Sequence, residues 1–123
     1  MAVMQSRDTR TEIAGEDLSS AQFKFVTLEA DGFVDLADSA GEAVYGVCLV
    51  GAAAASAVTV VRSGSCMIEA GAAVTAGDQL QTNAAGEAIT AASGDVVVGL
   101  AKEDGVDGQI IEMEIITGGN IVA

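Results

Sequence analysis

The clearest alternation of apolar and polar positions lies near the end of the chain, at residues 110–116 (IIEMEII). Every second residue from Ile111 to Ile115 is apolar, and glutamates stand between them. A period of two is typical of a strand with one buried face. Residues 22–26 (QFKFV) and 95–100 (DVVVGL) carry shorter runs rich in aromatic or β-branched residues, which favour strands.

Turns separate these runs at intervals of roughly ten residues. The chain has 15 Gly and no Pro, so its turns must be built by Gly, Asn and Asp. Residues 51–57 (GAAAASA) have helical propensity for at most a turn or two. Residues 57–63 (AVTVVRS) are apolar on both faces, which leaves their register open. The pattern predicts an all-β protein, a small barrel or sandwich.

The chain repeats the same order of parts. Residues 18–64 align with residues 74–118 at an offset that stays between 53 and 56. Three matches support this alignment: Gly32 with Gly86, GEAVYGVC (41–48) with GDVVVGLA (94–101), and Gly64 with Gly118. Similarity at a fixed offset over this length predicts two similar strand-hairpin repeats. Chance matching of Gly- and Ala-rich sequence is the alternative.

Residues 1–15 (MAVMQSRDTRTEIAG) lack a sustained period. They hold two of the five basic residues, and their own charges cancel, so the net charge of −13 belongs to residues 16–123. We therefore predict an extended N-terminal arm, disordered in the free protein, attached to a single β domain over residues 16–123 that folds without it. The candidate contact residues of the arm are Val3, Met4, Arg7, Arg10 and Ile13. A terminus without function is the alternative.

The composition narrows the classes of ligand and partner that we expect this protein to bind. Three Phe, one Tyr and no Trp provide little lining for a roomy ligand pocket. Binding to nucleic acid needs clustered Lys and Arg, and the five basic residues are spread out. Residues 43–61 are uncharged for long enough to span a bilayer, but their Ala, Gly, Ser and Thr provide little drive for insertion. We see no signal peptide, and we expect neither a nucleic-acid nor a membrane partner.

The chain also lacks the usual equipment for catalysis. It has no His, and its carboxylates lie in turns or alternate outward along a strand. Residues 102–109 (KEDGVDGQ) hint at a calcium loop, but Asp104 and Asp107 are three apart, which breaks the required alternation. Cys48 and Cys66 fit no redox motif, and we expect reduced, packed thiols; whether they pair stays open. We predict a protein that is not an enzyme and has no cofactor or metal.

The second half of the chain resembles the small capsid decoration, or cement, proteins of tailed bacteriophages. The resemblance is carried by residues 74–93 (VTAGDQLQTNAAGEAITAAS) and 94–115 (GDVVVGLAKEDGVDGQIIEMEI) and covers about residues 18–117. It implies a small barrel or clip-like β domain, often trimeric, that is made in the host cytoplasm and binds the major capsid protein on the outer surface of the virion. It implies no catalytic residues. The first 15 residues match no pattern of the family, so their role in capsid contact rests on their composition.

A homotrimer is what the resemblance implies, and the residues suggest where copies meet. Small side chains allow close approach of backbones, and an apolar tail needs a cover. The candidate oligomer contacts are Ala52, Ala53, Ala54, Ile121 and Val122.

Two other classes stay open. The turn at residues 74–80 (VTAGDQL) is similar to one in lipoyl- and biotin-carrier domains, although neither Lys24 nor Lys102 stands at a matching hairpin tip. A bacterial surface or fibre module is the third class, and it would need an export signal or a larger parent chain.

Overall fold

The computed structural model describes residues 4–116, 119, 121 and 122 of the chain, with Arg7 described by its backbone alone. Within these residues the regular structure consists of strands, and helices are absent, which confirms the all-β prediction. The strands are β1 (Ser6–Ile13), β2 (Phe25–Leu28), β3 (Val34–Leu36), β4 (Gly46–Val50), β5 (Ala57–Glu69), β6 (Gln79–Thr82), β7 (Ala88–Thr90), β8 (Gly99–Ala101) and β9 (Ile110–Ile115).

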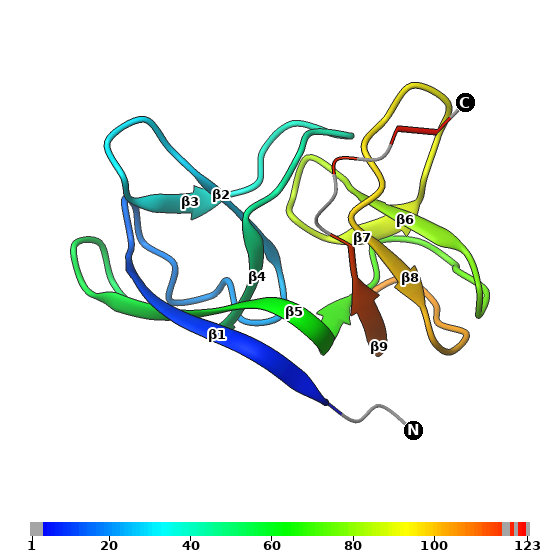
Figure 1. Ribbon diagram of the computed structural model, residues 1–123, viewed down its shortest axis with the longest axis horizontal. Helices are drawn as coiled ribbons and strands as arrows, with labels where there is room; N and C mark the ends of the chain where they lie inside the picture. Colours follow the sequence, from blue (N-terminus) through cyan, green and yellow to red (C-terminus); the bar gives the residue numbers. More distant parts are fainter. Residues whose placement is uncertain (1–3, 117–118, 120, 123) are drawn as a thin grey trace.

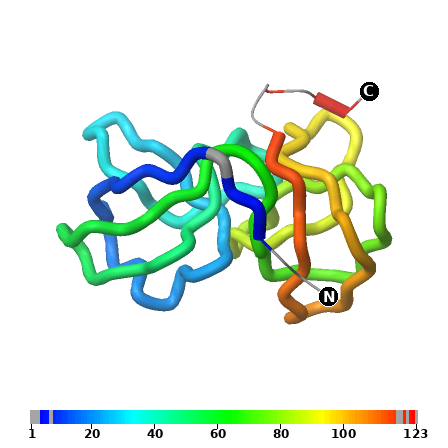
Figure 2. The backbone as a smooth tube through the Cα atoms, turned by 60° about the horizontal axis from the view of Figure 1, so that its bottom comes forward, coloured from blue at the N-terminus to red at the C-terminus, as the bar shows by residue number. Residues whose placement is uncertain are grey.

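The strands form one curled antiparallel sheet in the order β3-β2-β4-β5-β9-β8-β6-β7, with β1 added beside β5 (Figure 1). The pairs β2–β3, β2–β4 and β4–β5 of the first half recur as β6–β7, β6–β8 and β8–β9 in the second. The long strand β5 belongs to both halves, because it pairs with β4 near its start and with β9 near its end. The structure therefore contains the two strand-hairpin repeats, which lie side by side in Figure 2.

Individual hydrogen bonds recur in the two repeats, as the strand pairs do. In the first repeat the backbone N–H of Phe23 donates to Cys48 O over 2.7 Å, and in the second Gly77 N–H donates to Ala101 O over 2.8 Å. Phe23 and Gly77 both have a positive φ, of 63° and 92°. The sequence pattern had placed a strand at residues 22–26, but this left-handed residue delays the strand until Phe25. Equivalent loops of the two repeats therefore share their backbone conformation even where the residue types differ.

The structure corrects the prediction of a separate arm for the part of it that is described. Residues Ser6–Ile13 form β1 and pair antiparallel with β5. After β1, Ala14 makes a parallel bridge to Val34, just as Ala70, after β5, makes one to Ala88. β1 is thus the first strand of the first repeat, and the end of β5 takes the same place in the second. An edge strand with one exposed side needs no strict alternation, which is why the pattern was missed.

The core consists of two clusters of buried side chains. The larger one joins both repeats and includes Phe25, Ile68 and Met113. The smaller one fills the first repeat and includes Leu18 and Val26. Among the described residues Phe25 is the largest fully buried side chain, so one aromatic ring from the first repeat anchors the shared core.

Two expectations about exposed segments change. Glu112, expected on an outward face of β9, is buried, and its carboxylate accepts from Lys102 Nζ over 3.1 Å. Residues 43–61, the uncharged stretch, form β4, a loop and the start of β5. In the described part of the chain there is no helix with the length and apolar character needed to cross a membrane.

Candidate interaction surface

The longest exposed strand edge belongs to β1. Among the described strands, β1 pairs with β5 alone, and it is eight residues long. The other edge strands, β3 and β7, have three residues each. An edge presents unpaired N–H and C=O groups that can accept a further strand, and long edges do so best. β1 therefore offers the chain's most extended docking edge.

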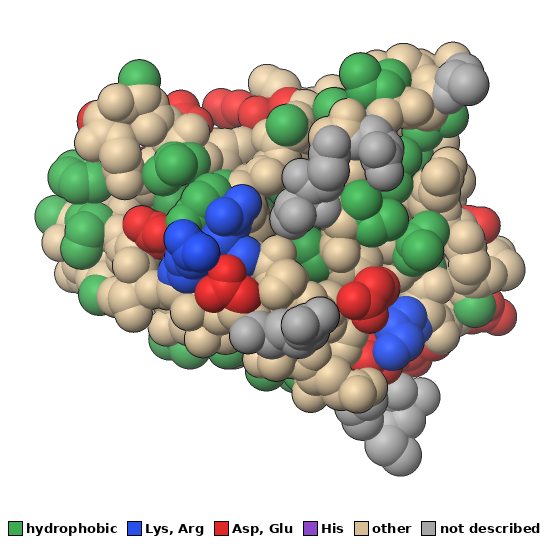
Figure 3. Space-filling model, viewed as in Figure 1, with side chains coloured by type: hydrophobic (Ala, Val, Ile, Leu, Met, Phe, Trp, Pro, Cys, Tyr) green, Lys and Arg blue, Asp and Glu red, His purple; other side chains and the backbone are tan. Residues whose placement is uncertain are grey.

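Basic and acidic side chains gather over β1, β4 and β5 (Figure 3). The Tyr45 hydroxyl donates to Glu12 Oε2 over 2.6 Å, and the Arg62 guanidinium lies 4.1 Å from the centroid of the Tyr45 ring. The hydrogen bond to Glu12, followed by burial, raises the pKa of Tyr45. The cluster connects Glu12, near the end of β1, to Arg62 on β5 and to Tyr45 just before β4. The edge of β1 is therefore held in place by side chains as well as by its backbone.

Arg10 faces solvent beside this cluster. Its guanidinium forms an exposed ion pair with Asp8, with 3.3 Å between Nη2 and Oδ2. The hydrogen bond with Asp8 raises the pKa of Arg10 further above its usual value. Exposed pairs of this kind are weak and exchange partners readily. The basic group therefore stays available to a carboxylate of a binding partner.

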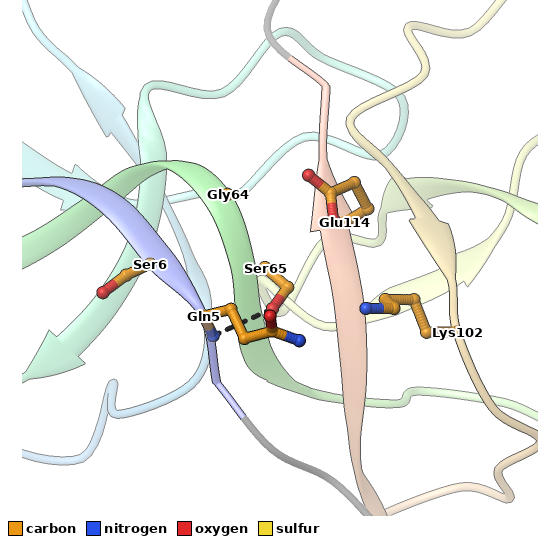
Figure 4. Close-up of a pocket in the computed structure, with 6 residues that line it drawn as sticks. All are labelled: Gln5, Ser6, Gly64, Ser65, Lys102 and Glu114. Carbon is orange, nitrogen blue, oxygen red and sulfur yellow. Dashed lines mark hydrogen bonds between the residues drawn. The ribbon is translucent and has the colours of Figure 1, made fainter.

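A hollow of about 370 Å³ lies where β5 passes from the first repeat to the second (Figure 4). It is lined by Gln5, Ser6, Gly64, Ser65, Lys102 and Glu114. The backbone N–H of Gln5 donates to Ser65 Oγ over 2.9 Å, and Ser65 N–H donates to Gln5 O over 3.2 Å. Gly64, with a φ of 86°, supplies the bend of β5. The lining is polar and open, which suits a contact surface better than a small-molecule pocket.

The predicted contact residues of the first segment separate into two groups. Arg10 and Ile13 are exposed on β1, next to its free edge. Met4 is partly buried and packs against the larger core cluster, so it is a structural residue. Val3 and the side chain of Arg7 lie outside the described residues.

The predicted oligomer contacts do not come together within one copy. The loop with Ala52, Ala53 and Ala54 lies at one end of the molecule, and Ile121 and Val122 lie at the other (Figures 1 and 2). Ala52 packs against the smaller core cluster, while Ala53 and Ala54 are exposed. Ile121 is 64% exposed and pairs with Val96. Whether these residues meet between copies stays a prediction.

Sequence reasoning missed several residues of the surface. Leu28 and Phe33 are large, apolar and exposed in the first repeat. Their counterparts in the second repeat, 54 positions on, are Thr82 and Glu87. A residue-by-residue comparison of the two repeats would have shown this change from polar to apolar.

The described residues contain no group of three or more His, Cys, Asp or Glu side chains that could hold a metal ion. Asp35 is the nearest approach to an unusual acid: its Oδ1 is buried and has no hydrogen-bond partner among the described atoms. Burial, and then the negative charges of Glu16 and Glu29, raise its pKa. The Asp35 carboxyl therefore lies in an unfavourable position among other acids, and it provides no metal site.

Both cysteines are free and buried. Cys48 belongs to the smaller core cluster and Cys66 to the larger one, so they face different cores. Burial raises the pKa of Cys48 to about 11 and that of Cys66 to about 12. These thiols are packing groups and stay protonated at neutral pH.

The lysines are engaged in ion pairs. Lys24 lies in a bend before β2, with its Nζ 3.7 Å from Glu87 Oε2, and Lys102 Nζ lies 3.1 Å from Glu112 Oε2. Neither lysine stands at a hairpin tip, where a carrier domain presents its modified lysine. The geometry gives the carrier alternative no support.

Comparison with known proteins gives two matches. A family model described as phage cement protein matches residues 9–114, from within β1 to within β9. Among solved structures, the chain is similar to the N base of head fiber gp8.5 of bacteriophage phi29, with a TM-score of 0.71 and 17% sequence identity. That match covers 92% of this chain and 97% of the other, and at this identity it shows a shared fold. No curated protein sequence matches the chain.

Proposed function

Since this chain belongs to the phage cement protein family, we propose that it binds the outer surface of a shell built by a major capsid protein and stabilises that shell in the virion. We further propose that it acts as a homotrimer, as the resemblance to decoration proteins implies, and without catalysis. The family is one of structural phage proteins, and the surface described above carries docking features in place of a reaction site.

One observation carries this proposal: the long free edge of β1 stands beside the basic part of an otherwise acidic chain. The net charge is −13, yet Arg7, Arg10 and Arg62 belong to β1 and β5. The other two basic residues are held in ion pairs with glutamates of the second repeat. A partner strand with carboxylates would gain both main-chain hydrogen bonds and charge complementarity at β1.

The shell would be stabilised because many copies of the protein bind to it. A ligand that binds the assembled shell and not its separated subunits stabilises the shell by mass action, and the gain grows with the ratio of free concentration to Kd. Because many copies bind one shell, each contact can be weak. The remaining acidic surface repels neighbouring copies except where they meet specifically.

The first test is binding of the full chain to undecorated shells. Co-sedimentation should show saturable binding, and the decorated shells should melt at a higher temperature than bare ones. Absence of binding would refute the proposed function.

A second test locates the contact. Arg10→Gln removes one positive charge beside the β1 edge, and Ala72→Glu makes the same change in net charge at an exposed loop of the second repeat. We expect Arg10→Gln to weaken shell binding about two- to fivefold at low salt, and Ala72→Glu to have a smaller effect. Equal effects of the two variants would show that the contact with the shell does not lie at β1.

One observation favours a second role. The structural neighbour is the base of a head fiber, so this fold can serve as an attachment base. Electron microscopy of decorated particles would distinguish the two, because a fibre base carries density that projects beyond the domain and a cement protein does not.

A further inference from the structure

The β2–β3 turn of the first repeat and the β6–β7 turn of the second have the same backbone but different surroundings. Gly32 N–H donates to Glu29 O over 2.9 Å, and Gly86 N–H donates to Asn83 O over 3.3 Å. Gly86 O also accepts from the N–H of Phe25 over 2.8 Å, so the first repeat covers this turn. A Cβ added at Gly32 would have no described atom within 4 Å, whereas one at Gly86 would lie 3.2 Å from Phe25 O.

The contact between the repeats extends beyond that turn. Glu69 N–H donates to Phe23 O over 2.8 Å, and Gly41 N–H donates to Thr82 O over 3.0 Å. The ion pair of Lys24 with the second repeat lies in the same contact. One side of the second repeat is therefore covered by a defined set of residues from the first.

The equivalent side of the first repeat is uncovered and exposes large apolar side chains. The counterparts of Glu69, Thr82 and Glu87 are Ile13, Leu28 and Phe33. Ile13 is 36%, Leu28 49% and Phe33 40% exposed, whereas Thr82 is fully buried. We call Ile13, Leu28, Gly32 and Phe33 the open end. Three large apolar side chains at positions where the second repeat has polar ones form a surface that suits a partner.

The covering surface is also present twice. In the second repeat the counterparts of Phe23–Phe25 and Gly41 are Gly77–Gln79 and Gly94, at the opposite end of the molecule (Figure 1). Gly94 N–H donates to Val122 O over 2.9 Å, the same kind of bond that Gly41 makes between the repeats. The tail thereby brings the exposed Ile121 to this surface. Because the tail already occupies the Gly94 N–H, we call Gly77–Gln79 and Ile121 the far end.

We propose that the open end of one copy binds the far end of a second copy, so that the part of the contact made by Phe23–Phe25 within the chain recurs between chains. This inference rests on the self-association proposed above and names its surfaces. The Gly77–Gln79 backbone would meet the β2–β3 turn as Phe23–Phe25 meets the β6–β7 turn, and Ile121 would contribute apolar cover. Because the two surfaces differ, the contact is heterologous, and it closes into a ring such as a trimer when the rotation between copies allows.

Cross-linking of two single variants of the full chain tests the orientation. Phe33→Cys places a thiol at the open end and Gln79→Cys places one at the far end, while the native Cys48 and Cys66 are buried and unreactive. The two proteins are mixed and treated with a short bismaleimide cross-linker, in solution at high concentration and on shells. We expect dimers that contain one copy of each variant, as mass spectrometry can show. Dimers that join two copies of the Phe33→Cys variant would indicate a symmetric contact and overturn the proposal. Absence of mixed dimers under both conditions would also overturn it.

A second measurement tests the apolar contact itself. Phe33→Glu installs the residue that the second repeat carries at this place, so the turn should keep its fold. Sedimentation equilibrium should show Kd for self-association raised at least about tenfold, because a carboxylate would be buried in the contact. Ser20→Glu adds the same charge at an exposed position in the loop between β1 and β2 and should leave Kd nearly unchanged. Equal Kd values for Phe33→Glu and the parent chain would refute the contact.

The two proposals fail in different ways. If the parent chain forms mixed cross-links in solution but does not bind shells, the proposed function is wrong and the head-to-tail contact stands. If it binds shells but forms no mixed cross-links there, the shell function stands and the head-to-tail contact is wrong.

Discussion

Ala55 provides a test of the repeat at the level of single-residue energetics. It lies in the loop between β4 and β5 with a φ of 67°, and its N–H donates to Ala14 O over 2.8 Å. The equivalent residue of the second repeat is Gly108, with a φ of 85° and a bond of 2.7 Å to Ala70 O. The left-handed conformation costs a residue with a Cβ about 1–2 kcal/mol, and glycine avoids that cost.

Ala55→Gly should therefore stabilise the protein. Glycine also makes the unfolded chain more flexible, which costs about 0.4–1 kcal/mol, so the expected net gain is about 0.5–1 kcal/mol. The Ala55 side chain is exposed, so little packing is lost. For a chain of this length the gain corresponds to a rise in Tm of about 2–5 °C.

The reverse substitution in the second repeat is the matched control. Gly108→Ala should lower the free energy of unfolding by a similar amount, because a Cβ there would have no described atom within 4 Å and only the backbone conformation resists it. Urea unfolding and thermal melting of both variants measure the two changes. If Ala55→Gly lowers stability, or Gly108→Ala leaves it unchanged, the two loops do not share their backbone conformation and the equivalence of the repeats fails at this point.

Three further predictions follow from the same geometry. A chain that begins at Gly15 loses β1 and exposes the buried strand β5. Its cooperative melting transition, followed by circular dichroism, should be lost or shift to a much lower temperature. A melting curve like that of the full chain would contradict the pairing of β1. Tyr45→Phe removes the 2.6 Å hydrogen bond to Glu12 and should cost about 1–2 kcal/mol in urea unfolding; a loss below about 0.3 kcal/mol would show that the bond is not formed. Because the pKa of Asp35 is raised in the folded protein, its ionised form destabilises the fold above that pKa. This penalty vanishes as the pH falls below the pKa that Asp35 has in the unfolded chain. Asp35→Asn should therefore stabilise the protein at about pH 7 and have little effect near pH 3.

The strand content and the repeat could be predicted because they depend on local patterns. Alternation along β9 and the glycines at equivalent turns, such as Gly32 and Gly86, report the backbone directly. That β1 belongs to the first repeat could not be predicted in the same way, since its residues show no alternation. Its signal was the match of residues 12–15 (EIAG) to residues 68–71 (IEAG), which lies just outside the stretch that was aligned.

The surface was harder to predict than the fold. Exposure of Phe33 depends on what covers the turn, and in the second repeat that cover comes from residues about 60 positions earlier in the chain. Burial of Glu112 depends in the same way on Lys102, a partner that directly follows the neighbouring strand β8. Such contacts follow from the relative placement of the repeats, and a single sequence contains no local pattern that reports it.

The continuity of β5 determines how the molecule responds to mechanical load. Its 13 residues pass from one repeat to the other without a break and bond to β1 and β4 at one end and β9 at the other. Tension applied along this strand would load its hydrogen bonds to the neighbouring strands in shear, so several bonds would share the load. A subunit held at its first repeat would therefore transmit force to the second through one continuous strand that bends at Gly64.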